Sequence, residues 1–158
     1  MSPSQWRYLR QEAAIGATIT AMLSLVFTLV MFGRAAQVPV FGAGGLIADA
    51  IPQNFFGALM CVVVPTIVTR RRLRSGSIAR APAVIRLPRA LLPRAVLVAA
   101  ITAGVGTLLA MLFLGTGPSK WPFLTVIVMK VAYGLLLGAI VSGVAARAAL
   151  ADEVGHQQ

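Results

Sequence analysis

The chain has 158 residues, of which 58% are hydrophobic and 11% are charged. A soluble domain carries about 25% charged residues, so this composition excludes a protein that stays dispersed in water and predicts an integral membrane protein of one domain. Its formal net charge of +10 is also typical of nucleic-acid-binding proteins, so the placement of the basic residues has to be considered. The single cysteine, Cys61, excludes a disulfide framework.

Four apolar runs are long enough to cross a bilayer core of ~30 Å, which needs roughly 20 residues. In chain order they cover about 13–33, 46–69, 95–115 and 122–150. The first run exceeds the apolar core of a signal peptide, about 7–15 residues, so we expect it to remain as a span. The sequence therefore predicts an all-α membrane protein with four transmembrane helices.

The basic residues cluster on one side of these spans. Arg7 and Arg10 precede the first span, and a basic loop at about 70–94 joins the second to the third. The positive-inside rule places both termini and this loop in the cytoplasm. We expect the loop to contact anionic lipids, and since it lacks aromatic residues for base stacking we expect no nucleic-acid partner. The loop arginines are Arg70, Arg71, Arg72, Arg74, Arg80, Arg86, Arg89 and Arg94.

The sequence of the first two spans resembles that of the last two, as expected for a two-helix unit that occurs twice. The letters ATITA at 17–21 align with AAITA at 99–103, and a second offset aligns Phe56 with Tyr133. The sequence therefore predicts two parallel-repeat helical hairpins, at about 7–73 and 89–150, followed by a disordered tail at 151–158. The alternative is chance similarity between hydrophobic helices.

The second helix of each hairpin carries small residues at a spacing of four. Such a stripe lets two helix backbones approach closely in a membrane, so we expect the two striped helices to face each other at the centre. The stripe residues are Gly57 and Cys61 in the first hairpin and Gly134, Gly138 and Ser142 in the second.

The segment MLSLVFTLVMFG, followed by a connection and FFGALMCVVVPTIVTRRRL, resembles a group of small bacterial two-helix membrane proteins of unknown function. In that group the second span similarly ends in a Val/Ala-rich run, a proline and an arginine cluster. The resemblance covers 13–73 and part of 95–150, where Ser142 replaces the proline. It implies a tandem duplication and a bacterial inner membrane, and it implies no activity.

Lys130 lies between two apolar runs of the fourth span, where an ammonium costs several kcal/mol. It precedes Arg147 by 17 residues, about 25 Å of helix, which places it near the outer boundary of the membrane. We expect Asp49, Gln53 and Asn54 of the second span to meet it there. The cluster is interpreted either as an interfacial or paired charge, or as the lining of an outward-facing binding or proton-relay site.

The remaining sequence provides little chemistry. The single histidine, His156, lies in the polar tail, and no carboxylate pair or His/Cys cluster lies in a span. We therefore expect no enzyme, cofactor or metal. The favoured hypothesis is a non-catalytic accessory or structural subunit, in a homo-oligomer or a larger membrane complex. The alternative is a small dimeric transporter or channel that uses the outer cluster around Lys130 and Asp49.

Overall fold

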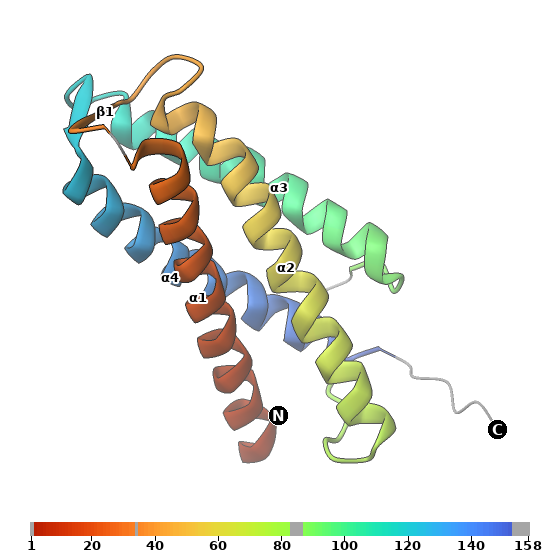
Figure 1. Cartoon of the computed structure of the whole chain (residues 1–158). Coiled ribbons are helices and arrows are strands. Elements are labelled where there is room, and N and C mark those ends of the chain that lie inside the picture. The colour runs from red at the N-terminus through yellow and green to blue at the C-terminus, as the bar shows by residue number, and fades with distance from the viewer. Residues whose placement is uncertain (1, 34, 83–86, 153–158) are drawn as a thin grey trace.

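The computed structural model describes residues 2–33, 35–82 and 87–152, which contain four long helices and two short strands (Figure 1). All four helices are long and apolar enough to cross a membrane, so this part of the prediction is confirmed. The elements in chain order are α1 (Pro3–Phe32), β1 (Gln37–Pro39), α2 (Leu46–Arg74), α3 (Leu91–Leu114), β2 (Lys120–Pro122) and α4 (Phe123–Leu150).

Helix α1 begins ten residues before the predicted span at 13–33. Ser2 and Gln5 form a capping box, in which each side chain satisfies a backbone N–H of the other residue. Pro3 occupies the first turn, where its fixed φ suits a helix start. These local interactions extend the helix past the apolar run, and its 30 residues make it about 45 Å long.

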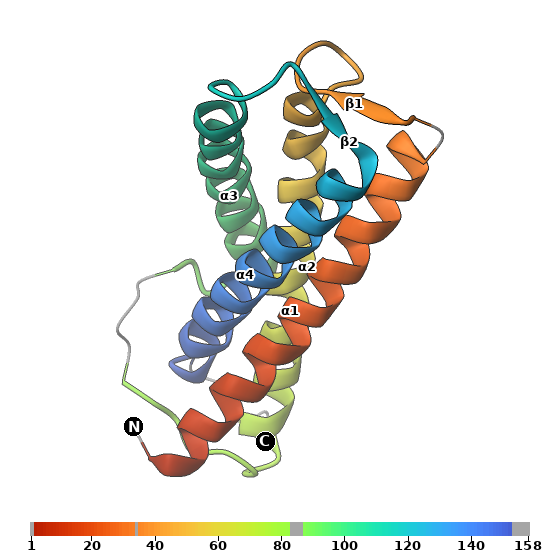
Figure 2. The same cartoon turned by 90° about the vertical axis from the view of Figure 1, so that its left-hand side faces the viewer.

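Strands β1 and β2 pair antiparallel and join the two connections at one end of the helices (Figure 2). Val38 lies opposite Trp121, and the Val40 N–H donates to the Ser119 carbonyl at 3.0 Å. We call this end the strand end. The opposite end, where α1 begins and α4 ends, is the terminal end.

The helices pack in two pairs that meet in the middle. Helix α1 packs mainly on α4 and α3 mainly on α2, while α2 and α4 contact each other. Buried apolar side chains form three clusters: around Val38 and Val126 at the strand end, around Ala58 and Ala99 in the middle, and around Leu150 at the terminal end. Many other large apolar side chains of the four helices point outward and are exposed.

The stripe of small residues on α4 packs against α1. A Cβ added to Gly138 would lie 2.6 Å from Thr20 Oγ1, and one added to Gly134 would lie 2.5 Å from Ser24 Oγ. The α2 stripe also contacts α1, because a Cβ on Gly57 would lie 3.4 Å from the Thr20 methyl group. The two striped helices contact each other, and residues of both stripes also pack on a third row of small residues, on α1.

Candidate functional site

Asp49 and Lys130 form an ion pair near the strand end. Asp49 is 4% exposed and lies in the first turn of α2, where the helix dipole favours a carboxylate. Lys130 Nζ donates a hydrogen bond to Asp49 Oδ2 from a side chain that is 13% exposed. The same Nζ lies 5.4 Å from the centre of the Phe32 ring on α1. The lysine therefore links three helices, and its charge is balanced within the bundle.

Gln53 and Asn54 are buried on the same helix as Asp49 but face different neighbours. Gln53 Nε2 donates to Ser24 Oγ at 2.8 Å and so connects α2 to α1. Asn54 faces the other two helices, because a Cβ added to Gly106 of α3 would lie 2.9 Å from Asn54 Cγ and 2.5 Å from the Tyr133 hydroxyl of α4. The predicted four-residue cluster is thus divided among separate contacts, and the ion pair is one of them.

Buried acceptors in this region, including Asn54 Oδ1, keep unused hydrogen-bonding capacity. Asp49 Oδ1 and Gln53 Oε1 have no hydrogen-bond partner within the described part of the chain. An unsatisfied buried polar atom costs about 1–3 kcal/mol, so water or another small donor is favoured beside them. The described residues contain no group of three or more His, Cys, Asp or Glu side chains that is able to hold a metal ion.

Several polar side chains deeper in the bundle bond to helix backbone or to each other, whereas Thr66, Thr107 and Ser142 have no hydrogen-bond partner among the described residues. Thr20 Oγ1 donates to the Gly16 carbonyl at 2.9 Å, and Thr28 Oγ1 donates to the Ser24 carbonyl at 2.6 Å. Such bonds satisfy a hydroxyl within apolar surroundings. Cys61 Sγ lies 3.0 Å from Thr20 Oγ1 and connects α2 to α1. Of these contacts, the one between Cys61 and Thr20 joins two helices, and the two threonine bonds lie within α1.

A second charged cluster closes the terminal end. Asp152, directly beyond α4, accepts hydrogen bonds from Arg70 at 2.7 and 2.9 Å and from Arg94 at 2.6 and 3.0 Å. Arg94 Nε also donates to the Pro88 carbonyl at 2.8 Å. Asp152 therefore belongs to the folded bundle, not to the tail predicted from residue 151. Residues 153–158, including His156, lie outside the described residues.

The arginines predicted to contact anionic lipids differ in their exposure. The side chain of Arg70 is 25% exposed, and that of Arg94 is 1% exposed. Arg94 is therefore an internal ion-pair residue and does not present its charge at the surface. Arg86 lies outside the described residues. The exposed members are Arg71, Arg72, Arg74, Arg80 and Arg89.

The sequence does not predict the contacts that attach the start of α1 to α2 and to the α2–α3 connection. Gln5 Nε2 donates to the carbonyls of Ala79 and Arg80, each at 3.0 Å. The Tyr8 hydroxyl lies 2.7 Å from Thr69 Oγ1. One signal was present in the sequence: a serine followed three residues later by glutamine is typical of a capped helix start. That signal places Gln5 and Tyr8 on α1.

No family model, curated protein or solved structure matches the chain.

Proposed function

We propose that this chain is a non-catalytic, multi-pass membrane protein that acts as a structural or accessory subunit beside other membrane helices. One observation carries the proposal: buried polar side chains serve contacts between its own helices. Lys130 pairs with Asp49, and Gln53 binds Ser24. The proposed location is a bacterial inner membrane, with the terminal end in the cytoplasm, as the arginines around that end favour.

Helix α3 provides the proposed contact surface for a partner. It packs mainly on α2, and its outward side chains include Leu92 and Phe113, which are 71% and 67% exposed. Ala100 and Gly104 are exposed at a spacing of four, and a Cβ on Gly104 would meet nothing within 4 Å. Small residues at this spacing allow close approach of another membrane helix. The partner is a second copy or a subunit of a larger membrane complex.

Association after mild extraction tests this proposal. Two differently tagged copies are expressed together, extracted in mild detergent, and assayed for co-purification and native mass. We expect a complex larger than the 16.6 kDa chain. We also expect Gly104→Leu to weaken association about tenfold, which corresponds to about 1.4 kcal/mol. Ala132→Leu is the matched control, because it adds bulk at an exposed position of α4. A single chain in detergent under all conditions contradicts the proposal.

One observation favours transport as the second candidate function. The unpartnered acceptors Asp49 Oδ1 and Gln53 Oε1 provide places for a small hydrogen-bond donor at the strand end. A transporter requires a polar path beyond this point, whereas Thr20 and Thr28 are bonded to the backbone of their own helix. We therefore expect proteoliposomes to show no proton or cation flux above empty vesicles. A flux abolished by Asp49→Asn would favour the transporter.

A further inference from the structure

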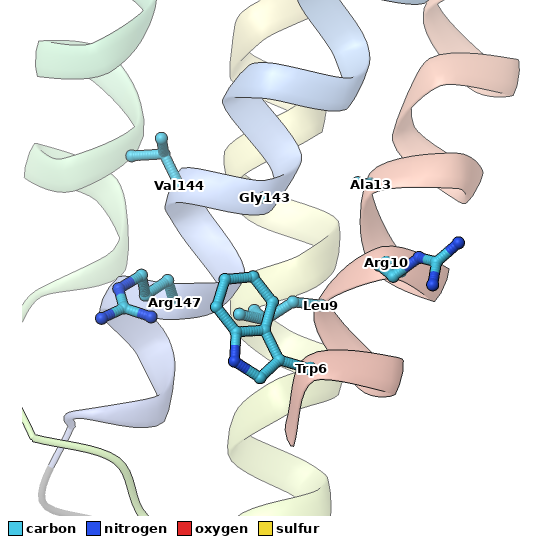
Figure 3. Close-up of a pocket in the computed structure, with 7 residues that line it drawn as sticks. All are labelled: Trp6, Leu9, Arg10, Ala13, Gly143, Val144 and Arg147. Carbon is cyan, nitrogen blue, oxygen red and sulfur yellow. The ribbon is translucent and has the colours of Figure 1, made fainter. Parts of the chain in front are cut away.

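An open groove of about 630 Å³ lies between α1 and α4 at the terminal end (Figure 3). Small and aliphatic side chains from both helices line it, together with one aromatic and two basic side chains. In Figure 3 the Trp6 ring lies between the two helices beside Arg147. The seven lining residues are Trp6, Leu9, Arg10, Ala13, Gly143, Val144 and Arg147.

The lining combines two kinds of chemistry. Leu9, Ala13 and Val144 present hydrocarbon, and Gly143 leaves room because it has no side chain. Arg10 and Arg147 contribute guanidinium groups to the groove. Guanidinium groups form strong charge-assisted hydrogen bonds with phosphate. A molecule with an apolar chain and an anionic phosphate therefore complements this groove.

The position of the groove matches the same chemistry. It lies at the end where α1 begins and α4 ends, within about one to three turns of those helix ends. Tryptophan is enriched at the level of lipid headgroups, because its ring is apolar and its N–H is polar. Trp6 and the arginines are thus placed for the headgroup region, and the apolar lining for the acyl chain.

We propose that this groove binds one phospholipid with an anionic headgroup from the cytoplasmic leaflet. The inference rests on the membrane placement in the proposed function, but not on the α3 contact surface. A helix of a second copy fits the groove less well, since its apolar side chains would remove water from the Arg10 guanidinium without balancing its charge. A phosphate balances that charge while the acyl chain covers the apolar lining.

Lipid retention and thermal unfolding test the site. The full chain in mild detergent is given phosphatidylglycerol or phosphatidylcholine with the same acyl chains, and is examined by native mass spectrometry and by thermal unfolding. We expect one retained phosphatidylglycerol and a midpoint about 3 °C higher than with phosphatidylcholine. Gly143→Leu should remove both effects by filling the groove, whereas Ala132→Leu, on the exposed face of the same helix, should retain them.

A charge variant gives a second readout in case Gly143→Leu does not fold. Arg10→Gln should reduce phosphatidylglycerol retention at least about threefold and phosphatidylcholine retention less, because phosphatidylglycerol has a net negative charge whereas the choline ammonium already balances the phosphate of phosphatidylcholine. Arg71→Gln removes the same charge from an exposed site on α2 and should have a smaller effect. Equal retention of the two lipids, or equal effects of the two arginine variants, would overturn the site. It would also be overturned if the groove variants changed the oligomeric mass of the protein and left lipid retention unchanged.

Discussion

The charges of Asp49 and Lys130 are largely buried and depend on each other. Asp49 is buried, and the lysine ammonium contacts both its carboxylate and the face of the Phe32 ring. A cation above an aromatic ring gains further electrostatic stabilisation. Removing two charges from water is nevertheless expensive, so such a pair often contributes little beyond what apolar residues of similar volume would contribute. Removing one of the two charged side chains is the costly change, because the other charge then stays buried without a partner.

This dependence predicts a thermodynamic cycle. Lys130→Met alone leaves the buried Asp49 carboxylate without its partner and should destabilise the protein by about 3 kcal/mol. The double variant Asp49→Leu/Lys130→Met removes both charges and should recover stability to within about 1 kcal/mol of the original protein. Thermal or denaturant unfolding in one detergent provides the measurement. Full stability of Lys130→Met alone would show that the pair is not needed.

Helix α1 is the element on which the other small-residue rows converge. Its buried residues Gly16, Thr20, Ser24 and Thr28 recur every four positions and form one face. A Cβ on Gly16 would lie 2.9 Å from the Gly138 carbonyl of α4, so the backbones of α1 and α4 are in close contact. In a membrane such contacts replace the hydrophobic driving force that operates in water. The α1–α4 interface is therefore expected to be the most sensitive to added bulk.

Cross-linking distinguishes this arrangement from a direct pairing of the α2 and α4 stripes. A Cβ on Gly134 would lie 3.2 Å from Ser24 Cβ, close to the ~3.5–4.5 Å separation found in disulfides. In a Cys61→Ala background, Ser24→Cys/Gly134→Cys should therefore form a disulfide readily under mild oxidation. Gly57→Cys/Gly134→Cys is the matched control and should react more slowly. Gel mobility measures the rate of disulfide formation. A faster reaction of the control pair would favour direct packing of the α2 stripe on the α4 stripe.

Sequence patterns predict the helices better than they predict the contacts between them. Long apolar runs indicate four spans directly, whereas strands of three residues, such as β1, are too short to show a periodicity. The pairing of Asp49 with Lys130 is predictable, because each is an isolated charge near the same end of the spans. The place of Asp152 is not, because a short polar segment after the last span gives no indication of which buried arginines it meets. The α1 row is visible in the sequence at its four-residue spacing, but the spacing alone does not indicate which helices it contacts.

The predicted duplication stays a prediction, and the main helix contacts of the whole molecule join its two hairpins. Helix α1 packs on α4 as α3 packs on α2, so the first helix of each hairpin contacts the second helix of the other. The strands β1 and β2 follow the first helix of each hairpin and pair antiparallel. A two-fold axis between α2 and α4 would relate these contacts, and a parallel repeat places such an axis along the membrane normal.

The charges at the two ends of the molecule predict its orientation in a membrane. Near the strand end, Asp49 and Lys130 balance each other, whereas the terminal end carries exposed arginines on α2 and on the α2–α3 connection. Unbalanced positive charge is retained on the cytoplasmic side, so the terminal end is expected inside.

Single cysteines at Ala43 and Ser77, both exposed and in connections at opposite ends, report the orientation in a Cys61→Ala background. A membrane-impermeant thiol reagent should label position 43 in intact cells and position 77 only after the membrane is permeabilised. The reverse pattern would contradict the orientation, and with it the cytoplasmic leaflet proposed for the lipid. Labelling of both positions in intact cells would contradict an arrangement in which α2 crosses the membrane between them.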